Sequence, residues 1–457
     1  MNHISRLMLI LVLLAATLPA GVVSVQAQAP SECAQVAGSL GATFTEGQLN
    51  GAKYCIIYPP NPKWNKDLVV FAHGYVFADP TNPSKQPEIP WDQVIRGDLN
   101  LPGILVNLGY AFAISGYRKD GLAVLEGLQD TVALVNYIKG TKNSVRRVFI
   151  TGASEGGLIT TLALQKYPKL FAGGLSTCGP IGDFQQQVNY WGNFRVTFDQ
   201  AFPFALRYPD LSPVPLPIPY PRSTPVFIDP TVMGLWGTDT APGPVGQIVG
   251  AMVQSQPAAV DALLAATGAP YDPADPTTKL ATIAGLLTYN VMATDEARWE
   301  LSGNPPVPIA QVPLMYGTLQ SSNLGNPLSY TELVNGVPVT TQADESALTE
   351  IANDYQTSGK LSRQLVVMHN TGDPIVPFWH VKLFTKKVLQ AGSLGKLSVI
   401  PIASYGHCNF TPAEAVFAFY TMVLRSTLLP FSMNQVKNAL PDVAAQKEYQ
   451  RLKSSVK

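Results

Sequence analysis

The chain has 457 residues, of which 46% are hydrophobic and only 14% are charged, and its 31 basic residues balance its 31 acidic ones. Globular domains average roughly 25% charged residues, and disordered chains contain few large apolar ones, so this composition excludes disorder and indicates a large buried core. The absence of a net charge also gives no electrostatic reason to expect a nucleic acid or an anionic membrane surface as a partner.

A short apolar run stands close to the N-terminus. Arg6 precedes residues 7–18, a run that has the length of a signal-peptide core and is too short to span a bilayer. Small residues follow it and offer a cleavage site after Ala27, and the alternative is an uncleaved membrane anchor. We therefore predict a signal peptide at residues 1–27, a secreted or periplasmic mature protein, and no stable membrane insertion after cleavage.

Export changes how the four cysteines are interpreted. An even number of cysteines in an oxidising compartment indicates disulfides, and sequence alone permits three pairings of Cys33, Cys55, Cys178 and Cys408. We favour a Cys33–Cys55 bridge, which would tie the mature N-terminus to the first strand. No group of cysteines and histidines has the spacing of a zinc site, so neither a metal nor another cofactor is expected.

Short apolar runs alternate with amphipathic stretches after residue 50. Helices are expected at residues 124–138 and 158–167, and strands at residues 52–58, 68–72, 110–117, 147–151, 173–177, 364–369 and 396–400. Continuous apolar runs separated by helices are typical of strands that are buried on both faces. The predicted fold class is therefore α/β, with a mostly parallel sheet and helices on both of its faces.

The alternation stops in the middle of the chain. Prolines at every second position from Pro213 to Pro221 exclude a central strand, and two helical stretches follow them. A structureless loop of this length would be unusual in a compact domain, whereas an inserted sub-domain with its own helices would not. The predicted organisation is a core of residues 28–182 and 346–457, interrupted by an inserted cap, or lid, at residues 183–345.

The most informative motif is Gly152-Ala153-Ser154-Glu155-Gly156-Gly157, which directly follows one predicted strand and directly precedes a helix. A G-x-S-x-G motif in that context predicts a nucleophile elbow. The turn is so sharp that bulky neighbours would collide, and it raises the serine hydroxyl above the carboxyl edge of the sheet, where ligands bind. Ser154 is therefore the candidate nucleophile.

A serine nucleophile needs a base, and the base needs an acid that orients it. Of the five histidines, His407 is the candidate base because it lies in a loop between the last predicted strand and the last long helix. Asp373 follows the preceding strand and is the candidate acid, with Asp183 as its competitor. The chain order Ser154, Asp373, His407 is the order expected when the nucleophile stands on an elbow of an α/β fold. The other histidines are His3, which leaves with the signal peptide, and three within the core. His73 is expected to shape a loop, a packed and hydrogen-bonded residue is one interpretation of His369, and His380 lies near a predicted helix start.

Acyl transfer also needs hydrogen-bond donors for the oxyanion. The backbone N–H of Glu155, which follows the nucleophile, is the first candidate. The second is the N–H of Tyr75, with Gly74 as the alternative, because both follow the buried strand at residues 68–72. The Glu155 side chain has two interpretations: it faces away from the site, or it repels anionic substrates and raises the pKa of the histidine.

The elbow, the acid in Gly372-Asp373-Pro374 and the base in Gly406-His407-Cys408 together resemble the α/β-hydrolase superfamily over residues 52–182 and 346–430. The Ser-x-Gly-Gly form resembles prolyl-oligopeptidase-type and feruloyl-esterase-like members. The His-Cys pair is similar to that of secreted tannases and feruloyl esterases, which join this cysteine to one that precedes the serine. Here Ala153 holds that place, and the resemblance implies Cys178, at the end of the next strand, as the partner of Cys408.

These observations favour a secreted serine esterase that cleaves a small-molecule ester through an acyl-enzyme on Ser154, with His407 as general base and acid and Asp373 as the orienting acid. The alternative is a secreted serine peptidase of the same fold, similar to an oligopeptidase. A non-catalytic binding protein is less favoured, because binding alone does not require all three side chains.

Overall fold

The central sheet of the protein places strands that are distant in sequence side by side. In the computed structural model, residues 29–76, 85–142, 144–201, 237–238, 241–242, 250–251, 254–289, 330–334, 337–341, 349 and 351–455 are described. Their eight-stranded sheet has the order β1-β2-β6-β3-β7-β8-β13-β14. The strands are β1 (Thr43–Leu49), β2 (Ala52–Tyr58), β3 (Asp67–Ala72), β6 (Ala111–Ser115), β7 (Arg147–Ala153), β8 (Gly173–Thr177), β13 (Gln364–Gly372) and β14 (Leu397–Tyr405).

The sheet is parallel from β6 to β14, and β1 and β2 form its antiparallel edge. Each predicted strand overlaps an observed one, because its apolar residues are buried on both faces, as in the fully buried β3 and β8. The strand β1 was not predicted. It is largely exposed, so it lacks the continuous apolar pattern on which the prediction depended. The mostly parallel α/β architecture is thus confirmed.

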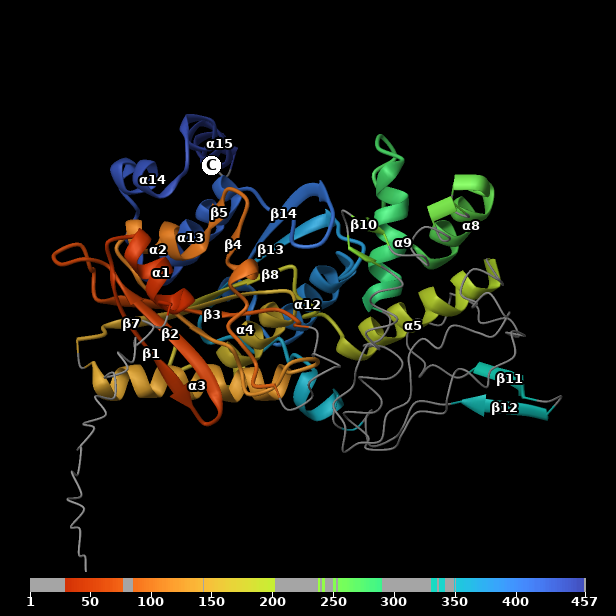
Figure 1. The fold of residues 1–457 in the computed structure, drawn as a ribbon, viewed down its shortest axis with the longest axis horizontal. Helices are drawn as coiled ribbons and strands as arrows, with labels where there is room; N and C mark the ends of the chain where they lie inside the picture. Colours follow the sequence, from red (N-terminus) through yellow and green to blue (C-terminus); the bar gives the residue numbers. More distant parts are fainter. Residues whose placement is uncertain are drawn as a thin grey trace, which may run out of the picture.

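Helices cover both faces of the sheet (Figure 1). One face carries α3 (Val124–Thr141), α4 (Glu155–Lys166) and α12 (Trp379–Gln390). The other carries α1 (Glu32–Ser39), α2 (Leu101–Asn107), α13 (Pro412–Thr427), α14 (Met433–Ala439) and α15 (Val443–Ser455). The apolar residues divide into two clusters, one on each side of the strands. Because β6 to β14 are parallel, their carboxyl ends lie along one edge of the sheet, between the two helical layers.

Further helices follow β8 and precede β13 along the chain, and they lie on the right in Figure 1. They are α5 (Phe184–Ala201), α8 (Pro257–Thr267) and α9 (Thr277–Tyr289). Their apolar residues join the core cluster on the α3 side, and a Cβ on Gly285 of α9 would lie 3.0 Å from the Cδ1 atom of Ile375. Three short hairpins complete the described strands: β4 (Ile95–Arg96) with β5 (Leu99–Asn100), β9 (Gly237–Thr238) with β10 (Ala241–Pro242), and β11 (Tyr330–Val334) with β12 (Val337–Thr341).

Some sequence predictions fall outside the described residues. They include the signal peptide at residues 1–27, the proline-rich run at residues 213–221 and most of the expected cap. In the part of the chain that is described, no helix combines the length and the apolar character needed to cross a membrane.

Two disulfides connect the sheet to its surroundings. Cys33 of α1 is joined to Cys55 of β2, and Cys178 at the end of β8 is joined to Cys408. The first bridge ties the described N-terminal helix to the sheet, as expected. The second spans 230 residues of sequence, which makes it a covalent connection between the two halves of the core.

The first turn of α4 lies so close to the sheet that only glycine fits there. A Cβ atom on Gly156 would lie 1.9 Å from the carbonyl oxygen of Ala72 in β3, and a Cβ on Gly157 would lie 2.8 Å from the carbonyl oxygen of Thr177 in β8. Both contacts are with backbone, which cannot rotate away. The glycines of the motif therefore determine how closely the helix after Ser154 approaches the strands.

We expect the substitution Gly156→Ala to destabilise the fold by more than about 3 kcal/mol, because the added methyl overlaps backbone atoms. Gly140→Ala in α3 is the matched control, because a Cβ there meets nothing within 4 Å. That control should raise stability by about 0.5–1 kcal/mol through helix propensity. Urea denaturation of both variants is the measurement. Equal stabilities of the two variants would contradict the close-approach argument.

Candidate active site

Ser154 stands between the end of β7 and the first residue of α4. Its backbone has φ 56° and ψ −122°, a conformation that a non-glycine residue rarely adopts and that marks stored strain. The turn is held by the Ser154 N–H, which donates to the carbonyl oxygen of Thr177, and by the Ser154 carbonyl, which accepts from the N–H of Gly157. The local sequence thus folds into the strand, tight turn and helix that the motif predicted.

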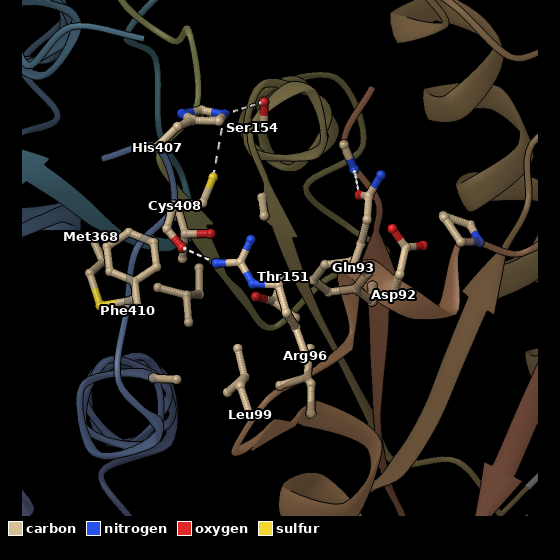
Figure 2. Close-up of a pocket in the computed structure, with 18 of the residues that line it drawn as sticks. Asp92, Gln93, Arg96, Leu99, Thr151, Ser154, Met368, His407, Cys408 and Phe410 are labelled. Atoms are coloured by element: carbon tan, nitrogen blue, oxygen red, sulfur yellow. Dashed lines mark hydrogen bonds between the residues drawn. The ribbon is translucent and has the colours of Figure 1, made fainter. Parts of the chain in front are cut away.

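His407 faces Ser154 from the loop that follows β14. Its Nε2 atom lies 2.9 Å from Ser154 Oγ, and its Nδ1 atom lies 2.8 Å from Asp373 Oδ2. Because the carboxylate oxygen accepts, Nδ1 carries the proton, and Nε2 accepts from the serine hydroxyl. The structure therefore brings the three predicted side chains together in one hydrogen-bonded row. Figure 2 shows its Ser154–His407 part.

Asp373 is fully buried at the end of β13. Its Oδ1 atom accepts from the N–H groups of Ile375 and Val376 at 2.9 and 3.0 Å, and its other oxygen accepts from His407. A buried carboxylate is tolerated only when donors of this kind replace water. The competing acid, Asp183, instead accepts from the Gln186 N–H and thus caps the start of α5.

Two buried histidines support the loop after Asp373 and are held neutral. His369 donates through Nε2 to the carbonyl oxygen of Val376, and burial lowers its pKa. His380 accepts the Gly182 N–H at Nδ1 and donates through Nε2 to Gln187 Oε1, and burial lowers its pKa well below the usual value. The contacts of His369 agree with its interpretation as a packed, hydrogen-bonded residue.

His73 and Gln93 hold the loop after β3. The carbonyl oxygen of Gly74 accepts from His73 Nδ1 at 2.7 Å, and the Gly74 N–H donates to Gln93 Oε1 at 2.7 Å. The Nε2 of Gln93 donates in turn to the Tyr75 carbonyl oxygen at 3.0 Å. The Gly74 N–H, which was the alternative oxyanion donor, thus already has a protein partner. Since a trans peptide directs its N–H opposite its C=O, the Tyr75 N–H points away from the His73 ring.

The side chain of Glu155 faces away from the nucleophile. Its Oε1 atom accepts the Ala123 N–H at 2.7 Å, next to the start of α3, and the residue is buried. Gly121, two residues before Ala123, donates its N–H to the carbonyl oxygen of Val76, which follows Tyr75. The first of the two interpretations of Glu155 therefore agrees with the structure: its carboxylate stabilises the segment that pairs with the Tyr75 loop.

The loop that carries His407 is fixed by residues that sequence reasoning did not identify. The side chain of Asn370, fully buried in β13, donates to the Asn409 carbonyl and accepts the Asn409 N–H. Arg96 donates to the Cys408 carbonyl at 3.4 Å. Cys408 (φ 51°) and its disulfide partner Cys178 (φ 46°) have positive φ angles, as Ser154 does. Nothing in the local sequence marks these contacts, because each joins segments that are far apart along the chain.

A pocket of about 520 Å³ opens beside Ser154 and His407. Its wall is mostly apolar, and Figure 2 shows the few polar side chains that also line it. The apolar lining residues are Phe71, Val76, Pro90, Leu99, Leu101, Ala153, Leu175, Met368, Phe410, Ala415 and Phe419, and the polar ones include Asp92, Gln93, Arg96, Thr151 and Thr177. A volume and lining of this kind suit a small organic molecule.

Among the described residues, Cys178, His407 and Cys408 form a group with metal-ligand distances. The two sulfur atoms are joined in a disulfide and therefore cannot act as thiolate ligands. The Cys408 sulfur lies 3.5 Å from His407 Nε2, so the bridge packs directly against the imidazole.

Comparison with known proteins relates this chain to hydrolases. Residues 105–192, which include the elbow, match the prolyl oligopeptidase family. No curated protein matches the chain. Feruloyl esterase B from Aspergillus oryzae is similar in structure, with 14% identity and a TM-score of 0.48 over 85% of this chain and 80% of that chain. An acylaminoacyl peptidase from Pyrococcus horikoshii has 13% identity and a TM-score of 0.36, over 80% of this chain and 37% of that chain.

Est1E from Butyrivibrio proteoclasticus has 11% identity and a TM-score of 0.35, over 86% of this chain and 99% of that chain. This chain spans about two fifths of the length of the acylaminoacyl peptidases that it resembles. The sheet, the elbow and the order of Ser154, Asp373 and His407 along the chain are those of the α/β-hydrolase fold. The matched family and this fold together support a hydrolase of the esterase or peptidase type.

The buried neutral state of His73 predicts a loss of stability in acid. Burial lowers its pKa from 6.5 to about 4, so the unfolded chain binds the proton more tightly. The stabilisation is therefore complete above pH 6.5 and is lost as the pH falls from there toward 4, by about 3 kcal/mol in all.

The amide of Asn in the variant His73→Asn can still donate to Gly74. We expect the free energy of unfolding of this variant to fall by about 2 kcal/mol less than that of the wild type between pH 7 and pH 4.5. Urea denaturation at both pH values measures this difference. His369 and His380 titrate in both proteins and cancel in the comparison. Equal losses in the two proteins would show that His73 is not the neutral buried group described here.

Proposed function

We propose that this protein is a secreted serine hydrolase that cleaves carboxylic esters through an acyl-enzyme on Ser154. The observation that carries the proposal is the hydrogen-bonded row from Ser154 Oγ to His407 Nε2 and from His407 Nδ1 to Asp373, at 2.9 and 2.8 Å. A nucleophile, a base within hydrogen-bond reach and an orienting acid are the parts that acyl transfer requires. The apolar pocket beside them suits an ester with an apolar portion.

The reaction begins when Ser154 Oγ attacks the ester carbonyl carbon and its proton passes to His407 Nε2. The Asp373 carboxylate stabilises the imidazolium that forms, through the Nδ1–H bond. The tetrahedral intermediate collapses, the bond to the alcohol oxygen breaks, and His407 gives its proton to that oxygen. A water then attacks the acyl-enzyme, His407 takes the water's proton and returns it to Ser154, and the carboxylic acid leaves.

The oxyanion that forms on the substrate carbonyl would be bound by the backbone N–H groups of Glu155 and Tyr75. Glu155 is the first residue of α4, and the first N–H groups of a helix point out of its N-terminus, where the helix dipole also favours negative charge. Gly74 and Tyr75 line the same pocket as Ser154. The contacts of His73 and Gln93 with this loop support Tyr75 as the second donor.

A peptidase of the same fold is the second candidate, and the match of residues 105–192 to the prolyl oligopeptidase family favours it. Amide hydrolysis additionally needs a subsite for the amine part of the substrate. The mostly apolar pocket suits an ester better, so the esterase is our first choice.

We further infer that the mature protein is exported and that residues 183–345 form a cap on a core of residues 28–182 and 346–457. The two disulfides support export, because such bridges persist in oxidising compartments. Contact of α5 with the Asp373 loop supports a cap beside the site: Gln187 and Trp191 donate to the Ile375 carbonyl, and Tyr190 donates to the Pro374 carbonyl.

A fluorophosphonate probe tests the nucleophile. We expect the folded protein to be labelled and Ser154→Ala to remain unlabelled, because the probe reacts only with an activated serine. Hydrolysis of p-nitrophenyl esters should fall by at least about 10³-fold in the same variant. Labelling that persists without Ser154, or no labelling of folded protein, would reject the proposal, and turnover of aminoacyl anilides alone would replace the esterase with the peptidase.

A second prediction concerns Gln93, which we regard as a positioning residue because it acts through the backbone of Gly74 and Tyr75. We expect Gln93→Leu to lower kcat by about 10–100-fold, since a misplaced oxyanion donor destabilises the transition state more than the bound substrate. KM should change by less than about 3-fold. Steady-state kinetics on a p-nitrophenyl ester provide both constants.

The matched control is Gln86→Leu, which removes a hydrogen bond between another glutamine side chain and a backbone carbonyl, that of Gly51. A decrease in kcat no larger than that of the control, or a change confined to KM, would show that Gln93 does not position the oxyanion loop.

A further inference from the structure

The pocket beside Ser154 contains a positive charge that the hydrolysis steps do not use. Of the described residues that line it, Arg96 alone carries a permanent positive charge. Arg96 belongs to the short hairpin of β4 and β5, and Figure 2 shows its guanidinium directed between Cys408 and Thr151. Its position suggests a role in binding the substrate.

Within the described part of the chain, Arg96 uses little of its hydrogen-bonding capacity. Its one protein hydrogen bond among the described residues is a weak one, from an Nη2 donor to the Cys408 carbonyl at 3.4 Å. Within the described part of the chain, no carboxylate lies at ion-pair distance from it. By contrast, Arg118, Arg146 and Arg147 each contact an aspartate. A guanidinium has five N–H donors, and its planar pair of N–H groups matches a carboxylate.

The surroundings of Arg96 restrict what it can bind. The wall of the pocket that it shares is mostly apolar and includes Leu99, Phe410 and Phe419. An ion pair formed against such a wall is less screened than one at an open surface. Asp92 also lines the pocket and would repel an anion placed next to it. An anionic substrate group is therefore favoured at the Cys408 side, where the guanidinium lies, rather than across the whole pocket.

Arg96 lines the same pocket as the reacting groups Ser154 and His407. Arg96 contacts the carbonyl of Cys408, the residue that follows His407, and His407 Nε2 lies 2.9 Å from Ser154 Oγ. A substrate whose ester group is at Ser154 would therefore need only a short apolar spacer to bring a carboxylate to the guanidinium. A pocket of about 520 Å³ has room for such a molecule.

We propose that Arg96 is a specificity-determining residue that binds a carboxylate on the substrate, so that the preferred substrates are esters that carry a free carboxylate beyond a short apolar spacer. This inference rests on the proposed ester hydrolysis. The carboxylate belongs either to the acid part of the ester, as in a half-ester of a dicarboxylic acid, or to the alcohol part, as in a hydroxybenzoate ester.

Hydrolysis followed by pH-stat titration distinguishes these two sources. Monoethyl adipate against ethyl hexanoate tests a carboxylate in the acid part, and 4-acetoxybenzoate against phenyl acetate tests one in the alcohol part. We expect the wild type to prefer the charged member of one pair. Arg96→Gln should lower kcat/KM for that member by about 10–100-fold, the usual effect of losing charge-assisted hydrogen bonds. For the neutral member the loss should be at least about 5-fold smaller, because Asn370 and the Cys178 bridge still hold the His407 loop.

The matched control is Arg363→Gln, which removes an exposed arginine that donates to the Pro168 carbonyl outside the pocket. This substitution should leave kcat/KM unchanged for the charged and the neutral member of both substrate pairs. Equal losses for charged and neutral substrates in Arg96→Gln would show that Arg96 only supports the His407 loop, and the proposal would fail. A wild type without preference in either pair would overturn it as well.

Binding to the inactive Ser154→Ala protein separates this inference from the proposed function. We expect calorimetry to show that the charged ester of the preferred pair binds Ser154→Ala, and binds Ser154→Ala/Arg96→Gln at least about 10-fold more weakly. Absent turnover of every ester by the wild type, together with this Arg96-dependent binding, would reject the hydrolase and retain the carboxylate site. Turnover of the neutral esters with no Arg96-dependent binding would reject the site and retain the hydrolase.

Discussion

The structure of the site depends on one fully buried carboxylate. Asp373 exchanges its hydration for two backbone N–H groups and the Nδ1–H of His407. In this environment the carboxylate has few alternative geometries, because each oxygen already has a fixed donor. The imidazole is therefore held in the tautomer that leaves Nε2 as an acceptor toward Ser154. The loop that supplies the two backbone donors must be equally well fixed, and this requirement explains much of the polar core around it.

That loop is held mainly from outside the parallel core. Three side chains of α5 donate to the carbonyls of Pro374 and Ile375. One of them, Gln187, is in turn oriented by the neutral ring of His380 in α12. A histidine that became charged here would lose its acceptor at Nδ1, and burial disfavours that form. Helix α5, at the start of the inserted segment, is therefore part of the support of Asp373, so a cap at this position would also affect the geometry of the site.

The sequence was informative wherever the chemistry is local. The elbow requires Gly152, Gly156 and Gly157 next to the serine, and the buried strands have continuous apolar runs, so both were predicted. The exposed edge strand β1 lacks that pattern and was missed. The supports of the site, Gln93, Asn370 and Gln187, were also missed, because a glutamine or asparagine that binds a distant backbone has no local signature. The sequence could not choose between the two possible oxyanion donors after β3, because the contact between Gly74 and Gln93 also joins segments that are distant along the chain.

The loop that carries His407 is attached to the core on several sides. Asn370 holds the backbone of Asn409, and the Cys178 bridge holds Cys408 to the end of β8. Because these attachments already restrict the loop in the free protein, less conformational entropy is lost when a substrate binds. The bond from Arg96 to the Cys408 carbonyl is the weakest of these attachments, and Arg96 is also the one that lines the pocket. A substrate group that binds Arg96 would therefore act on the backbone next to the general base, so that binding specificity and the position of His407 are physically connected.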